Sequence, residues 1–487
     1  MRHGAPQVFL QWPRSTDVPY PNERANRLGH VPTVSNVAVQ EAFQRWVITT
    51  AQPGDRSSIE TLCRSLDYLP EGANSDQVCF SITVDGSDQE VEVTREHPTV
   101  KAGYLRVAGS FVDLESLEKA GQGRFVDPTI LRNAHHESSF DAALPGSGLV
   151  ITGCSGVDTW RQEVTRFLSE TKFDSDSPRT LADAILSVHG LPGKPAANIE
   201  LNTCPACRTE RKDEMTMTVD LAGGSCSQCG ASLYIGDVLR SHEEYQPEAS
   251  NLTALSRVMT VSERLMTLSF MEHFFDSAAA AEVFRRTIFI TDGPLALFGT
   301  IAPLHRRFLA YHEALANWGD SKQIHAPLVV GIEKSGRMAE HASLVADSIP
   351  RGSVMMLTSD YINQVTGRPL GNRYGVDEFY GRRFIYRTTA GAPLVITVPP
   401  KPGVLPYGGP DSESFDSYPL LRPVCEVLDR VQTRLYPNAV IPVALAHSAA
   451  ALPLGVGHSV LRAMAQRGLG LPQVTQQPRH PSVGFNR

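Results

Sequence analysis

Residues 78–87 read Val-Cys-Phe-Ser-Ile-Thr-Val-Asp-Gly-Ser, an apolar, β-branched run that ends in three turn-forming residues. This composition favours a buried strand that stops at a tight turn. Residues 90–94 and 100–114 have the same strand character. We therefore predict three consecutive strands in an antiparallel meander, with the Asp85 carboxylate at the end of the first strand.

Apolar spacing predicts helices on both sides of this meander and an alternation of helices and strands beyond it. Asp292 ends the first of the later strands and, like Asp85, precedes a glycine. The pattern as a whole predicts an α/β fold with a mixed sheet flanked by helices. The predicted helices cover residues 34–50, 58–69, 157–190, 252–275, 301–317, 337–347, 414–434 and 456–467, and the later strands cover residues 287–291, 327–332, 383–387, 394–398 and 440–445.

Composition excludes several classes of protein. The 41% apolar and 20% charged content is that of an ordinary globular chain rather than a fibre or a disordered protein. A net charge of -7 argues against a protein that coats nucleic acid by charge alone, although it permits a local basic groove. Because no long apolar run and no secretory signal are seen, we expect a cytoplasmic protein without a membrane span.

Four of the eight cysteines form two Cys-x-x-Cys pairs, Cys204 with Cys207 and Cys226 with Cys229. The 18 residues between the pairs fall within the range of a tetrahedral zinc ribbon. Four thiolates would fill the coordination shell and leave no position for water or substrate, so the predicted Zn²⁺ is structural. Catalysis must then lie elsewhere, and the other four cysteines are expected to be reduced thiols.

The two strand-end aspartates, Asp85 and Asp292, are the candidates for catalysis. Cleavage of a phosphodiester with two divalent ions needs several carboxylates at one point, and strand ends supply such points. Either aspartate alone could be just a turn residue. The order of a meander, a helix and a further strand that ends in Asp292 is, however, that of a ribonuclease-H-like fold.

Six segments together carry a resemblance to a known family: residues 84–87, 234–243, 258–265, 292–299, 331–336 and 446–447. With them the sequence resembles the longer members of the NurA nuclease family. The resemblance implies a ribonuclease-H-like core and Mn²⁺- or Mg²⁺-dependent cleavage of DNA, including 5′-to-3′ exonuclease activity. It also implies a homodimer that docks onto a hexameric HerA-type ATPase in DNA end processing or phage defence.

The metal ligands that the resemblance implies are two aspartates, a helix-borne glutamate and a residue near the C-terminus. Asp85 and Asp292 match the aspartates directly. Glu263 and Glu272 lie nine residues apart on one predicted helix and point to nearly opposite sides, so only one can reach the metal. A strand of about 20 Å is matched by about 13 helical residues, which places Glu263 at the level of Asp292. Glu272 is expected to be a solvated helix charge.

His447 and Lys334 complete the predicted site. His447 follows the predicted strand of residues 440–445 and would bind the metal or protonate the leaving group, unless it is a packed core histidine. Lys334 follows a strand and would meet a phosphate as a point charge, unless it is a solvated turn lysine. The charged groups at residues 135–137 and 382–383 are expected to be surface-loop or edge-strand charges.

The chain is accordingly divided into a flexible N-terminus (1–33), a helical module (34–75), a nuclease domain (76–470) with an inserted zinc ribbon (200–235), and a flexible tail (471–487). Two rival functions remain open. One is a catalytically silent adaptor that loads DNA or a partner onto an ATPase ring. The other is a metal-dependent phosphoesterase that uses the same acids on small substrates.

Overall fold

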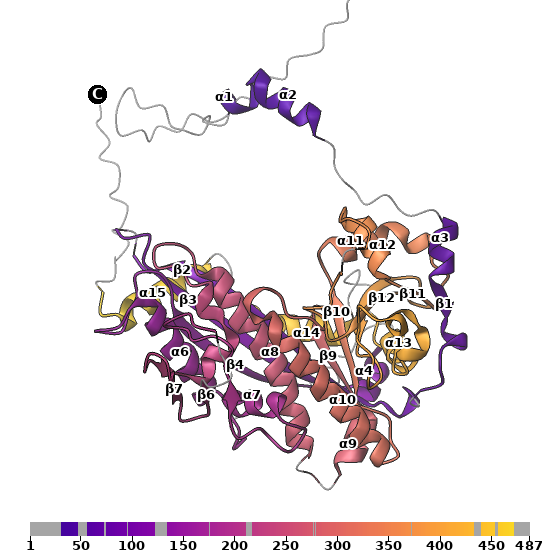
Figure 1. Ribbon diagram of the computed structural model, residues 1–487. Coiled ribbons are helices and arrows are strands. Elements are labelled where there is room, and N and C mark those ends of the chain that lie inside the picture. Colours follow the sequence, from indigo (N-terminus) through magenta and orange to yellow (C-terminus); the bar gives the residue numbers. More distant parts are fainter. Residues whose placement is uncertain are drawn as a thin grey trace, which may run out of the picture. The chain divides into compact units, whose positions relative to one another are not determined.

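The computed structural model divides into two compact units, residues 1–52 and 53–487, which are described separately (Figure 1). None of the helices described is both long and apolar enough to cross a membrane. The predicted division into module, nuclease domain and tail stays a prediction, and most of the two predicted flexible ends lies outside the described residues. The residues described are 31–46, 56–72, 75–94, 96–121, 134–174, 176–210, 217–275, 277, 279–371, 373–432, 440–452 and 456–471.

In the first unit, a short helix, α1 (Val31–Val34), precedes α2 (Val37–Arg45). The Asn36 side chain caps α2 by accepting a hydrogen bond of 2.9 Å from the backbone N–H of Ala38. Such a cap satisfies one of the backbone donors that a helix start leaves free. The predicted helix over residues 34–50 is therefore present in part, and it ends at Arg45.

The second unit is built on a nine-stranded mixed sheet with the order β1-β11-β12-β13-β10-β9-β2-β3-β4. β2 runs parallel to β9 and β9 parallel to β10, whereas all other neighbours are antiparallel. The predicted α/β class with a mixed sheet is confirmed. The strands are β1 (Cys63–Ser65), β2 (Phe80–Glu92), β3 (Lys101–Asp113), β4 (His135–Pro145), β9 (Thr287–Asp292), β10 (Leu328–Glu333), β11 (Ser353–Met356), β12 (Arg382–Arg387) and β13 (Pro393–Val398).

The meander differs from the prediction in one respect that matters for the site. β2 does not stop at Asp85 but continues to Glu92, because Asp85 pairs with Ala108 and Gly86 with Val107 on β3. The predicted strands of residues 78–84 and 90–94 are thus one strand, and β4 is the third member of the meander. Cross-strand pairing along the full length of β3 overrides the turn preference of Asp-Gly.

Helices cover both faces of the sheet (Figure 1). One core joins the sheet to α6, α7, α8 and α10, and the other joins it to α13 and α14. On β9, Phe289 belongs to the first core and Ile288 and Ile290 to the second, as expected from the alternation of side chains along a strand. These helices are α6 (Gly156–Glu170), α7 (Leu181–His189), α8 (Leu252–Phe275), α10 (His305–Ser321), α13 (Leu421–Arg430) and α14 (Ile441–Ala450).

Further helices complete the second unit. The predicted long helix over residues 252–275 is confirmed as α8. The shorter helices are α3 (Arg56–Thr61), α4 (Leu114–Gly121), α9 (Ala280–Arg286), α11 (Arg337–Val345), α12 (Ser359–Thr366) and α15 (Val456–Gly468).

Two predicted elements have the wrong type. Residues 440–445 were predicted as a strand but form the start of helix α14, with Pro442 in its first turn. A short apolar run fits either element, and a proline in the first turn favours the helix. The predicted helix over residues 58–69 ends at Thr61, because Cys63–Ser65 pairs with β11 and becomes an edge strand of the sheet.

The neighbouring arginines Arg382 and Arg383 are buried, contrary to the prediction of edge-strand charges. β12 is an interior strand, and Arg382 to Tyr386 are buried on both of its faces. Arg383 forms a two-pronged ion pair with Glu333 on β10. Arg382 has no exposed surface, and its guanidinium donates to the carbonyl oxygens of Leu357, Pro406 and Ser412 and to the Glu413 carboxylate.

We predict that Arg382→Met lowers the free energy of unfolding by about 3 kcal/mol, because it leaves buried acceptors without donors. Chemical denaturation followed by fluorescence measures this change. Arg306→Met is the matched control, since its ion pair with Asp377 is exposed, and it should change stability by less than about 0.5 kcal/mol. Equal effects of the two substitutions would contradict the prediction.

Candidate metal centre

The pairing of β2 with β9 brings Asp85 and Asp292 together. Val84 is paired with Thr291 in parallel register, so the next residue of each strand lies at the same level of the sheet. His447 on α14 reaches the same point, with its Nδ1 atom 2.8 Å from Asp85 Oδ2. One ligand atom from each of Asp85, Asp292 and His447 lies within 4.8 Å of the others.

Lys334 follows β10 directly and joins this group. Its Nζ atom lies 2.5 Å from Asp292 Oδ2 and 3.7 Å from Asp85 Oδ2. The ammonium thus bridges the two carboxylates rather than pointing into solvent, as a lone turn lysine would. Strand β10 places it there, because Ile332 is paired with Asp292 across the parallel ladder.

The electrostatics of the group indicate a site for a cation. Burial, together with the nearby Asp85 carboxylate, raises the pKa of Asp292 to about 7, and Lys334 offsets part of the rise. Two crowded carboxylates disfavour each other's ionised form, whereas a cation between them favours it. Carboxylate oxygens are ligands that Mg²⁺ and Mn²⁺ prefer, and an imidazole can complete such a set. The residues present therefore fit a divalent ion.

Glu263 approaches the centre from the other face of β2. It lies on α8 and is only 5% exposed. A Cβ atom on Gly86 would come within 2.6 Å of Glu263 Oε1, so the glycine leaves the space that the carboxylate occupies. Burial is the main cause that raises the pKa of Glu263 well above its usual value, with Asp85 and Asp292 adding to the rise. Glu263 is near both aspartates but outside the group that meets within 4.8 Å.

Glu272, the alternative glutamate, is not the solvated helix charge that was expected. It is 1% exposed, and its carboxylate accepts hydrogen bonds from Arg179, the backbone N–H of Gly193 and the Tyr311 hydroxyl. These partners come from segments around the far end of α8. Glu272 therefore stabilises the packing of the α8 helix, and its position leaves Glu263 as the glutamate next to the centre.

Two polar residues that sequence reasoning missed hold helix α14 against the meander. Ser87 on β2 donates to the carbonyl oxygen of Ala450 and accepts from the backbone N–H of Leu452. Arg106 on β3 donates to the carbonyl oxygen of Ala449 over 2.8 Å. Because Ala449 and Ala450 follow His447 by two and three residues on α14, these contacts hold the part of the helix that carries His447. Ser87 lies in the motif of residues 84–87, whereas no local sequence pattern singles out Arg106.

The four paired cysteines gather as predicted. One Sγ atom from each of Cys204, Cys207, Cys226 and Cys229 lies within 4.8 Å of the others. The Sγ atoms of Cys204 and Cys229 are 3.8 Å apart. A tetrahedron with Zn–S bonds of about 2.3 Å has edges of about 3.8 Å, so the four sulfurs could hold a zinc ion.

Local backbone geometry shapes both cysteine turns in the same way. Arg208 follows the first pair with φ 59°, and Gly230 follows the second with φ 73°. Their backbone N–H groups donate to the carbonyl oxygens of Cys204 and Cys226. Short two-stranded sheets flank these turns: β5 (Ile199–Glu200) with β6 (Thr218–Val219), and β7 (Gly224–Ser225) with β8 (Ser232–Leu233).

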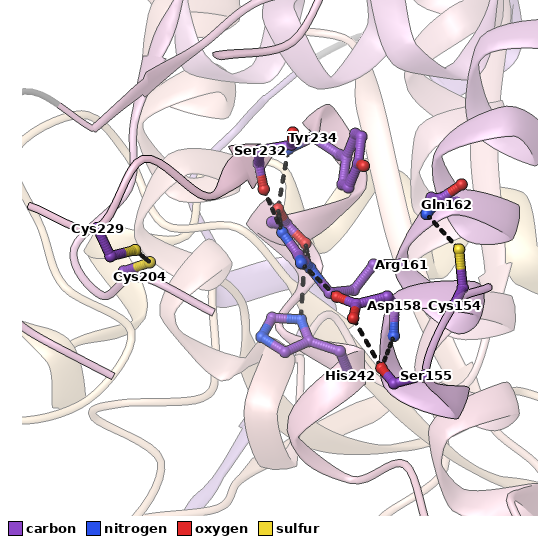
Figure 2. A network of polar contacts seen from close by, with 11 residues as sticks. Cys154, Ser155, Asp158, Arg161, Gln162, Cys204, Cys229, Ser232, Tyr234 and His242 are labelled. Carbon is purple, nitrogen blue, oxygen red and sulfur yellow. Dashed lines mark hydrogen bonds and ion pairs between the residues drawn. The ribbon is translucent and has the colours of Figure 1, made fainter. Parts of the chain in front are cut away.

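Residues of the motif 234–243 take part in a buried polar network with helix α6 (Figure 2). Arg161 on α6 forms a two-pronged ion pair with Asp237 at 2.8 Å and donates to the carbonyl oxygen of Ser232 on β8. The Asp237 carboxylate also accepts from the backbone N–H of Tyr234. These contacts anchor the base of the cysteine segment to α6 and give Tyr234 and Asp237 of the motif a structural role.

Comparison with known proteins adds little to this geometry. No protein-family model matches the chain, and no curated protein sequence matches it. A crystal structure of NurA with manganese is similar with a TM-score of 0.21 and 9% sequence identity, over 91% of this chain and 98% of that one.

We predict that Gly86→Ala weakens Mn²⁺ binding about 10-fold, because the new methyl group displaces the Glu263 carboxylate. Isothermal titration calorimetry with Mn²⁺ measures the affinity, and a melting curve checks the fold. Gly468→Ala is the control, since nothing lies within 4 Å of a Cβ atom there. An unchanged Mn²⁺ affinity in Gly86→Ala would show that the position of Glu263 does not matter to the centre.

Metal analysis of the purified chain should find about one zinc per chain, and Cys226→Ser should lose most of it because a tetrahedral site needs all four ligands. The same substitution is expected to lower the melting temperature, since zinc binding contributes to folding. Cys154→Ser is the control, because Cys154 lies outside the group of four. Full zinc retention in Cys226→Ser would exclude this ligand set.

Proposed function

We propose that this chain is a divalent-metal-dependent DNA nuclease that hydrolyses phosphodiester bonds, including by 5′-to-3′ exonuclease action. The observation that carries the proposal is the meeting of Asp85, Asp292 and His447 within 4.8 Å, with the Lys334 ammonium on the same carboxylates. Such a cluster can hold Mn²⁺ or Mg²⁺ next to a phosphate-binding cation. The NurA-like motifs contribute these same residues.

A ribonuclease-H-like core is the fold that we propose around this centre. Its support is the order and direction of five strands: the antiparallel meander β2-β3-β4, then β9 parallel to β2, and β10 parallel to β9. Helix α8 precedes β9 and packs on the meander. The two aspartates lie on the neighbouring strands β2 and β9 of this core.

In the proposed reaction each residue has a role that follows from its contacts. Asp85, Asp292, Glu263 and His447 would hold one or two divalent ions, which supply an activated water and stabilise charge on the leaving oxygen. Lys334 is placed to bind a phosphate oxygen once its carboxylate partners are engaged. His447 would take one of two roles: as a ligand it completes the metal set, whereas as a free imidazole, oriented through Nδ1 by Asp85 and 63% exposed, it would give a proton to the leaving group instead.

The partners that we propose follow from the resemblance rather than from the site. They are DNA, a second copy of the chain in a homodimer, and a hexameric HerA-type ATPase that moves DNA through the complex. The setting would be DNA end processing or phage defence. The four-cysteine site is proposed to hold a structural Zn²⁺, since its ligand set leaves no position for substrate.

The test is Mn²⁺-dependent cleavage of end-labelled single- and double-stranded DNA by the full chain. We expect wild-type cleavage and a loss of about 100-fold or more in Asp85→Asn, because stabilisation of the leaving oxygen by the metal amounts to several kcal/mol. Asp347→Asn, an exposed surface aspartate, should cleave at the wild-type rate.

Each rival function predicts a different result in this assay. Binding of DNA by the wild type without cleavage, with or without Mn²⁺, would support an adaptor. Turnover of bis(4-nitrophenyl) phosphate with intact DNA would support a phosphoesterase for small substrates. Cleavage of DNA by Asp85→Asn at the wild-type rate would show that the metal centre takes no part in the reaction.

A further inference from the structure

Arg264 is a buried cation beside the metal centre to which the proposed reaction gives no role. It follows Glu263 on helix α8 and is only 5% exposed. An arginine is seldom buried to this extent unless its guanidinium is paired or hydrogen-bonded. Its contacts therefore indicate what the side chain does.

The guanidinium contacts two segments that carry metal-centre acids. Its Nη1 atom lies 3.5 Å from Glu263 Oε2, and its Nη2 atom donates to the carbonyl oxygen of Pro294 over 3.1 Å. Pro294 belongs to the turn that follows Asp292, and Gly293 in this turn donates to Ile332 on β10. A single side chain thus connects the glutamate on α8 to the end of strand β9.

The contacts of Arg264 hold Glu263, which is the one acid of the centre whose position is not fixed by strand pairing. The pairing of β2, β9 and β10 fixes Asp85 and Asp292 relative to each other, whereas Glu263 comes from a helix on the other face of β2. A glutamate side chain has several rotatable bonds, so its carboxylate needs a partner to hold one position. The planar guanidinium can hold the carboxylate and the turn together, which a lysine ammonium does less well.

We propose that Arg264 is a positioning residue that sets the Glu263 carboxylate at a defined place relative to Asp292 and so raises the affinity of the centre for a divalent ion. The inference rests on the proposed function in that it takes Glu263 as a metal ligand. In this proposal Arg264 is not itself a ligand of the ion. Its effect on metal binding therefore passes through Glu263.

A double-mutant cycle on Mn²⁺ affinity, measured by calorimetry on the full chain without DNA, tests this route. Arg264→Met should weaken Mn²⁺ binding about 10-fold in the wild-type background, a typical cost for losing a residue that orients a ligand. In the Glu263→Gln background the same substitution should change the affinity less than about 2-fold, because residues that act through one another are not additive. Equal effects in both backgrounds, or no effect in the wild type, would overturn the proposal.

Two further variants show whether a loss of Mn²⁺ affinity comes from the contact of Arg264 with Glu263 or from damage to the fold. Arg264→Lys retains the charge and should bind Mn²⁺ more weakly than the wild type but more tightly than Arg264→Met. Wild-type affinity in Arg264→Lys would overturn the role given to the planar guanidinium. Arg257→Met removes an ion-paired arginine seven residues earlier on α8, a partner of Glu244, and should keep the affinity within about 2-fold.

The cycle also separates this inference from the proposed function. If the wild type binds Mn²⁺ but leaves DNA intact, the nuclease proposal fails. The Mn²⁺ affinities of the double-mutant cycle still show whether Arg264 acts through Glu263. If the wild type does not bind Mn²⁺, both proposals fail. If the wild type cleaves DNA but the effects of the two substitutions on Mn²⁺ affinity are additive, the proposal for Arg264 fails and the nuclease proposal stands.

Discussion

The parallel pairing of β2 with β9 is the constraint on which the rest of the centre depends. It places Val84 opposite Thr291, and the next residue on each strand is an aspartate. A shift of the register by one residue would turn one of these carboxylates to the opposite face, because side chains alternate along a strand. The apolar residues on both faces of β9 hold this register, since each face belongs to a separate core.

Concentrating carboxylates at one buried point opposes folding unless cations compensate for them. Burial and mutual repulsion raise the pKa values of Asp292 and Glu263. Two cations reduce this effect from opposite sides of β2, Lys334 on the aspartates and Arg264 on the glutamate. The acids are therefore arranged at a cost in stability that a bound divalent ion would lower, which is typical of functional sites.

The part of the chain between β4 and α8 is held by buried polar contacts outside the centre. It includes α6, α7 and the four-cysteine segment, whose base is anchored through the ion pair of Arg161 with Asp237. Glu272 similarly connects the far end of α8 to Arg179 and Tyr311. These buried polar contacts help to hold the helices that pack together on this face of the sheet, among them α8, which carries Glu263.

The sequence by itself determined the features that depend on local chemistry. They are the extent of α8, the strand that ends at Asp292, and the two cysteine turns, because periodicity and short motifs decide these. Tertiary structure decided that β2 continues through Asp85 and Gly86, since pairing with β3 outweighs a turn preference. It also decided the burial of Glu272 and the bridge made by Arg264. Each of these depends on partners far away in the sequence, whose position no local pattern records.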